Sequence, residues 1–274
     1  MLTKTMIRSS IEIINLYLPN LWKYLNEAEF KTFLSKAFEH TEKHNGGTPN
    51  NNFIVTFFEL VKEHNTNNSR IIRNEFGYFN HLLGEFEKFG NRREFKNLLV
   101  AALYNFERNN FHHTLGEIAA CLDLSLNHAF QKYERRLENQ KSIDFEFVRE
   151  NGDTILVDVL TIDYNKSRYE KEKFKIFLDG RLDTKFNEKS KDLDLELKRK
   201  IFVFPILSGF TIDIIKEQSD YLKNVSNSTI EENGFQTYAP KAFGNVQGTF
   251  FSLFTIDEII NPELIRKNYS QHGV

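Results

Sequence analysis

The sequence predicts an α/β fold in which a helical N-terminal region precedes a mixed α+β sheet flanked by helices. Apolar residues recur at spacings of three and four along the first part of the chain, which is typical of amphipathic helices. After Gln140, alternating and β-branched segments take turns with helical ones in the order strand, strand, helix, strand, helix. That order implies a mixed sheet covered by helices. The 274 residues are 40% hydrophobic, which excludes a disordered chain and allows a large core.

The N-terminal elements follow from this periodicity and from its interruptions. Pro19 breaks or kinks the first helical run, which extends from Ile11 to Leu25, and a second run covers 30–38. The stretch Asn45–Asn52 is rich in Gly, Asn and Pro and predicts a loop. Further helices are expected at 53–63, 70–89 and 92–108.

A β-hairpin is expected at the start of the α/β part. Residues 142–148 alternate apolar and polar side chains, Asn151–Asp153 marks a turn, and 154–162 is strand-like. The elements expected after the hairpin are a charged helix at 168–191, a buried strand at 200–207, a helix at 212–222 and a strand at 249–255. We therefore assign residues 1–110 to a helical region and 111–274 to the α/β domain, with its core at about 125–210.

Composition restricts the function classes. The net charge of −2 is not that of a general polyanion-binding protein, and the single Cys121 excludes an internal disulfide framework or a Cys-rich zinc site. No apolar run is long enough for a transmembrane helix. Glu12 and Asn15 interrupt the first apolar stretch and no cleavage site follows, so a cytoplasmic protein is expected.

The register of the hairpin decides which acidic side chains meet. A three-residue loop at 151–153 pairs Glu150 with Thr154, which buries the apolar residues of both strands on one face. The other face then carries Asp144, Glu146 and Asp158, with Glu146 directly across from Asp158. Three carboxylates on one face repel one another, and Mg²⁺ would relieve that repulsion. The alternative is an acidic face that simply contacts water.

This pattern resembles the PD-(D/E)xK superfamily of nucleases, which has the restriction-endonuclease-like fold. Asp144 matches the first acid, and Asp158-Val159-Leu160 matches the acid-x-Lys tripeptide. The resemblance covers about residues 115–210 and implies a nuclease that depends on Mg²⁺ or Mn²⁺. It adds an acid from the preceding helix, for which Glu134, in an expected helix at 125–139, or Glu117 qualifies. Its crossover helix and following strand correspond to 168–191 and 200–207.

Leu160 stands where the family has its lysine, which orients the attacking water and stabilises charge. One hypothesis is that Lys185 or Lys189 on the following helix replaces it. In that case Asp144, Glu146, Asp158 and Lys185 form the catalytic set. The other is an inactive relative that keeps the fold and binds nucleic acid. A role in defence or mobile-element biology is what the resemblance implies.

A second motif, at 114–136, resembles a helix-turn-helix. Thr114 and Glu117 form a capping-box pattern, and 123–125 would be the turn. The second helix would present to DNA the polar and basic side chains of Gln131, Lys132, Arg135 and Arg136. Residues 166–200 carry twelve Lys/Arg against eight Asp/Glu, and this local excess of positive charge favours binding of a polyanion. A non-enzymatic DNA-binding protein and a protein-interaction scaffold are therefore alternatives, and a homodimer stays open.

Overall fold

The computed structural model describes residues 4–43, 53–66, 71–89, 91–104, 111–164, 171–225, 236–246 and 250–264. The chain forms two compact units, Met1–Leu122 and Asp123–Val274, which we call the first and the second unit. The division expected from the sequence followed residue 110, so residues 111–122 lie in the first unit. The predicted loop at 45–52 lies outside the described residues.

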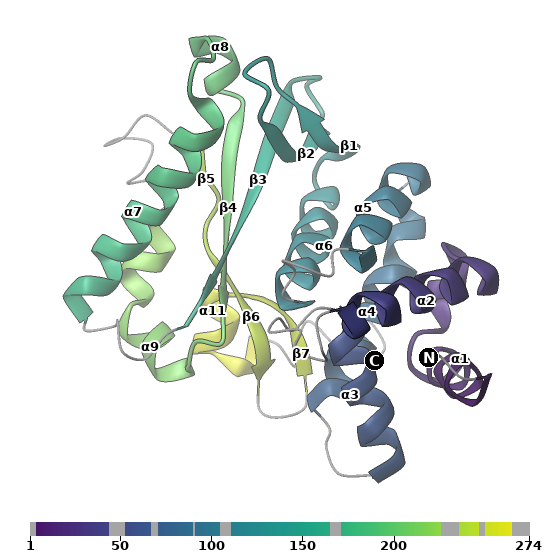
Figure 1. The fold of residues 1–274 in the computed structure, drawn as a ribbon. Coiled ribbons are helices and arrows are strands. Elements are labelled where there is room, and N and C mark those ends of the chain that lie inside the picture. The colour runs from purple at the N-terminus through teal and green to yellow at the C-terminus, as the bar shows by residue number, and fades with distance from the viewer. Residues whose placement is uncertain are drawn as a thin grey trace. The chain divides into compact units, whose positions relative to one another are not determined.

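The first unit is helical, as predicted (Figure 1). Its described elements are α1 (Lys4–Tyr17), η1 (Pro19–Lys23), α2 (Glu27–Lys43), α3 (Phe53–Thr66), α4 (Ile71–Glu85), η2 (Phe86–Lys88), α5 (Arg92–Tyr104) and α6 (Phe111–Ser125), whose last three residues belong to the second unit. Pro19 lies in the first turn of η1, where its missing N–H costs no hydrogen bond. Phenylalanine fills the core, and Phe30, Phe33, Phe57 and Phe76 are fully buried.

The second unit contains a mixed sheet with the strand order β1-β2-β3-β4-β6-β7, and β5 pairs with β4 (Figure 1). The strands are β1 (Ala129–Arg136), β2 (Ser142–Val148), β3 (Thr154–Asp163), β4 (Ile201–Ser208), β5 (Gln236–Thr237), β6 (Lys241–Val246) and β7 (Phe250–Thr255). The helices are α7 (Lys171–Ser190), α8 (Leu195–Lys198), α9 (Ile212–Glu217) and α11 (Ile256–Ile260), and residues 219–225 are also helical.

The pairing directions confirm a mixed α/β sheet. Strands β1, β2 and β3 form an antiparallel meander, β4 runs parallel to β3, and β6 runs parallel to β4. All eight residues of β4 are buried, as is expected for a parallel strand covered on both faces. The predicted hairpin, the strands at 200–207 and 249–255, and the charged helix before β4 are all present.

The prediction of a second helix at 125–139 is wrong. Residues 129–136 form β1, the edge strand, which pairs antiparallel with β2 in the register Tyr133↔Phe145. The residues meant for DNA recognition therefore lie on a strand, and no helix-turn-helix forms at 114–136. Thr114 lies inside α6 rather than at its start. Propensity alone did not separate helix from strand here, because pairing with β2 decides it.

The predicted register of the hairpin is wrong by two residues. Val148 pairs with Thr154 and Glu146 pairs with Leu156, so the turn spans Arg149–Asp153. Within it, the Gly152 N–H donates to the Arg149 carbonyl, and Gly152 has a φ of +86°, which glycine adopts without strain. A shift of two preserves the assignment of side chains to faces but changes every cross-strand partner.

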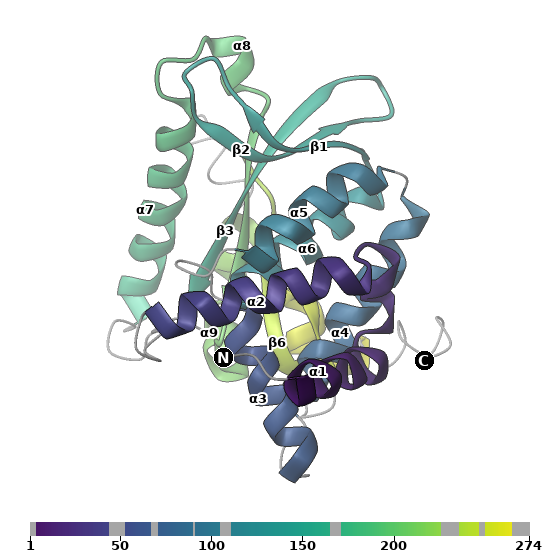
Figure 2. The same cartoon turned by 45° about the vertical axis from the view of Figure 1, so that its right-hand side comes forward.

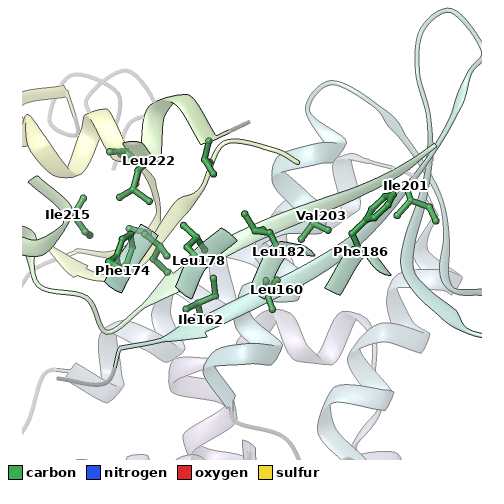
Figure 3. Packing of buried hydrophobic residues seen from close by; sticks show 14 of the residues in the cluster. Leu160, Ile162, Phe174, Leu178, Leu182, Phe186, Ile201, Val203, Ile215 and Leu222 are labelled. Carbon is green, nitrogen blue, oxygen red and sulfur yellow. The ribbon is translucent and has the colours of Figure 1, made fainter. Parts of the chain in front are cut away.

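Helix α7 packs against one face of β3 and β4 and buries an apolar layer between them (Figures 1 and 2). Leu178, Leu182 and Phe186 of α7 lie in one cluster with Leu160 and Val203 of the sheet (Figure 3). The spacing of four between the helical residues gives α7 one apolar stripe. The same stripe continues into the residues that form the candidate site.

Candidate functional site

Asp158 lies at the centre of the candidate site. It is on β3, it faces α7, and its side chain is 0% exposed. The Lys185 ammonium lies 2.7 Å from Asp158 Oδ2, and the Lys189 ammonium lies 3.0 Å from Oδ1. Neither contact has hydrogen-bond geometry, so both buried oxygens have no hydrogen bond among the described residues. Two cations thus contact a single buried carboxylate, one at each oxygen.

Asp144 lies beside Asp158 because of the observed register. The pairing of β2 with β3 ends at Phe145 and Val157. The next position along both strands places Asp144 opposite Asp158. Beyond this point the Asp144 carboxylate, rather than a backbone carbonyl of β2, accepts a hydrogen bond from the Val159 N–H at 2.7 Å. Burial and the neighbouring charge of Asp158 raise the pKa of Asp144 to about 7.

The two lysines reach Asp158 because they extend the apolar stripe of α7. Lys185 and Lys189 are four residues apart, so both project from the face that carries Leu182. Both are mostly buried, with side chains 23% and 17% exposed. The Lys189 ammonium also donates to the Ser142 carbonyl at 2.6 Å, which ties the last turn of α7 to the start of β2.

Asn139 holds the end of α7 in place. Its amide group lies in the turn between β1 and β2 and donates to the carbonyls of Lys189 and Lys191, at 2.8 and 2.7 Å. The Lys189 carbonyl is among those that a helix C-terminus leaves without partners, and the Lys191 carbonyl follows directly after α7. The β1–β2 turn therefore fixes the position of the two lysine residues relative to the sheet. Sequence reasoning missed Asn139, and no motif pointed to it.

Leu160 belongs to the core. It is 5% exposed and packs under α7 with Leu182 (Figure 3). On β3 it shares a face with Asp158, two residues before it. An ammonium at position 160 would have to replace an apolar side chain in this layer. The cations near Asp158 come instead from α7, from one side of the sheet rather than from the strand itself.

The other expected acids do not join this cluster. Glu146 forms an ion pair with Arg135 on β1. Glu134 lies on β1, not on a helix, and is exposed, with a left-handed φ of +51°. Glu117 lies on α6, in the first unit. In the described ranges, no group of three or more His, Cys, Asp or Glu side chains is arranged to hold a metal.

The residues predicted to contact nucleic acid all lie on β1. Gln131, Lys132 and Arg136 are exposed along this edge strand, and Arg135 is engaged by Glu146. Charged and bulged edge strands resist pairing with other chains, and β1 has a register shift between Phe130 and Lys132. Their placement on an edge strand gives these side chains a structural explanation that needs no ligand.

The cluster can hold a proton and attract a cation. A carboxyl group with a pKa near 7 changes its protonation state close to neutral pH, which suits a general acid or base. Two carboxylates are also the ligand set that Mg²⁺ commonly takes from a protein, with water and phosphate completing its shell. A metal ion here would have to take over the Asp158 oxygens that the two ammonium groups now contact, with Asp144 beside them.

Comparisons with known proteins identify no relative. No family model, no curated protein and no solved structure matches the chain. A search of the described helices for one both apolar and long enough to cross a membrane finds none.

Proposed function

We propose that the second unit is an atypical metal-dependent nuclease in which lysines of α7 replace the missing motif lysine. The observation that carries this proposal is the contact of 2.7 Å between the Lys185 ammonium and the buried Asp158 carboxylate. β3 has Leu160 at the position of the motif lysine, and Lys185 of α7 places a cation beside Asp158 instead.

The order of elements supports the proposal. Two antiparallel strands carry Asp144 and Asp158, a crossover helix follows, and β4 then runs parallel to β3. This is the arrangement that the resemblance to PD-(D/E)xK nucleases implies. Asp144 and Asp158 would hold a Mg²⁺ or Mn²⁺ ion. When bound, that ion supplies activation of water and stabilisation of the leaving phosphate oxygen.

The side chains of the chain have separate roles in this proposal. Lys185 stabilises negative charge that develops on the phosphate, because its ammonium is desolvated and its position is fixed by the packing of α7. Asp144 is held beside Asp158 by the hydrogen bond that it accepts from the Val159 N–H. Lys189 positions the site, since it joins Asp158 to the Ser142 carbonyl. Glu146 takes no part, because Arg135 holds its carboxylate.

A cleavage assay on the full chain tests the proposal. The wild type is incubated with plasmid, single-stranded DNA and RNA in Mg²⁺, Mn²⁺ or EDTA. DNA is the expected substrate. Asp158→Asn and Lys185→Met are each expected to lower the cleavage rate by about 10²-fold or more, because each removes a charge next to the reacting phosphate.

Two matched variants separate chemistry from general effects of charge. Lys191→Met removes an exposed lysine just after α7, and Glu146→Gln removes the acid that is paired with Arg135. Both are expected to cleave like the wild type, and circular dichroism checks that every variant is folded.

Other outcomes overturn the proposal. Absence of cleavage with tight, salt-sensitive binding would identify an inactive relative that binds nucleic acid. Absence of both cleavage and binding would favour an interaction scaffold.

A further inference from the structure

A cavity of about 260 Å³ lies at the end of the second unit where the β2–β3 turn meets the start of β4. Arg149 and Asp153 line it from the turn, and Glu196, Arg199 and Lys200 line it from α8 and the residues that lead into β4. It therefore brings together three cations and two acids from segments far apart in the sequence.

The cavity is separate from the Asp158 site. Phe202 and Ile155 line the cavity, whereas their neighbours Val203 and Leu156 pack in the cluster under α7. Successive side chains of a strand point to opposite faces, so the cavity lies on the face of the sheet away from Asp158. Whatever binds there does not contact the Asp158–Lys185 pair.

The charges of the cavity do not cancel. The Lys200 ammonium pairs with Glu196 at 2.8 Å, and the Asp153 carboxylate accepts from the Asn151 amide at 2.8 Å. Arg149, Arg199 and Lys200 outnumber Asp153 and Glu196, so the cavity carries one net positive charge. A bound anion would balance this charge.

The Arg149 side chain is held from the protein side. The Arg149 guanidinium lies over the ring of Phe202, 5.2 Å from its centre, which fixes its plane. The Gln236 amide donates to the Arg199 carbonyl and so fixes the backbone at the start of β4. A planar guanidinium whose orientation is set in advance binds phosphate oxygens through two parallel hydrogen bonds at low entropic cost.

We infer that the pocket between Arg149 and Arg199 binds a phosphomonoester group. The volume suits a ligand as small as inorganic phosphate or as large as a terminal nucleotide, and it is too small for an extended strand. Two sources share this chemistry: a free phosphorylated metabolite and the 5′-phosphate end of a nucleic-acid strand. The inference does not depend on the proposed nuclease, because the pocket uses none of its residues.

Isothermal titration in EDTA tests this inference without any cleavage. The probes are inorganic phosphate, a 5′-phosphorylated oligothymidylate and the same oligonucleotide with a 5′-hydroxyl. Arg199→Gln and Arg149→Gln are each expected to weaken phosphate binding about tenfold or more, because a hydrogen bond to a charged group is lost. Lys216→Gln, which removes an exposed cation on α9, is expected to bind like the wild type.

The two sources give different results. Preference for the 5′-phosphorylated oligonucleotide over inorganic phosphate would assign the pocket to strand ends, and equal binding would assign it to small phosphorylated ligands. The inference is overturned if the wild type binds neither phosphorylated probe. It is also overturned if the 5′-hydroxyl oligonucleotide binds as tightly as the phosphorylated one, or if both arginine variants keep wild-type affinity. Thermal unfolding of Arg149→Gln shows whether a loss of phosphate affinity in this variant comes from the missing guanidinium or from a destabilised fold.

Discussion

Asp144→Asn is expected to stabilise the protein above neutral pH. The folded state raises the pKa of Asp144 from 3.8 to about 7, chiefly through burial and then through the charge of Asp158. A raised pKa means that the folded state binds the proton more tightly than the unfolded state. The resulting stability is fully present below about pH 4 and is lost as the pH rises through 7. Asparagine is never ionised, so the variant avoids this loss and still offers an oxygen to the Val159 N–H.

The magnitude follows from the size of the pKa change. A shift of one pKa unit corresponds to about 1.4 kcal/mol, so the change to about 7 sets an upper limit of about 4 kcal/mol at pH 8. Asp144 is only partly buried, and water at its carboxylate lowers the effect to about 2–3 kcal/mol. If Asp144 serves catalysis as proposed, the same substitution lowers the cleavage rate while it raises stability.

Urea unfolding at constant ionic strength, followed by circular dichroism at pH 5, 6, 7 and 8, measures this difference. The free energies of unfolding of wild type and Asp144→Asn should diverge from pH 5 to about pH 7 and then differ by a nearly constant amount, with the variant more stable at pH 8. Asp183→Asn, an exposed substitution on α7, is the control and should follow the wild type. Parallel profiles for wild type and Asp144→Asn across this range would refute the argument that burial holds a proton on Asp144.

Three further predictions concern α7 and its partners. Lys185→Met should lower the free energy of unfolding by about 1–3 kcal/mol in urea titrations, because buried Asp158 keeps only one cation, whereas exposed Lys191→Met should change it little. Leu182→Ala should cost about 2–5 kcal/mol in the same assay, since its fully buried side chain leaves a cavity under α7. Asn139→Ala should cost about 1–2 kcal/mol and speed amide hydrogen exchange in the last turn of α7, because the carbonyls of Lys189 and Lys191 lose their donor.

The sequence and the structure agree on which faces of the hairpin are apolar. Phe145 and Phe147 alternate with polar residues, and the structure buries both, as the alternation predicts. Register is a separate question, because a shift of two residues leaves every side chain on its face. The Arg149–Asp153 turn decided it, and the result brings Asp158 opposite Asp144 rather than Glu146.

Residues 129–136 show where local pattern fails. The segment carries Lys and Arg at spacings that suit a helix, but it forms the edge strand next to β2. The hydrogen bonds that select a strand come from a partner segment, and a single stretch of sequence does not reveal that partner. For this reason the predictions of a helix-turn-helix and of Glu134 on a helix were both wrong.

By itself the sequence determined the helical first part, the α/β second part, the faces of the hairpin and the lysines at positions 185 and 189 as candidate substitutes for Leu160. These depend on periodicity and residue type, which are local. Only the tertiary structure decided that α7 turns both ammonium groups toward Asp158 and that Asn139 holds the end of α7. The physical reason is that a buried charge is stabilised by groups brought close through packing, and packing joins segments far apart in the chain.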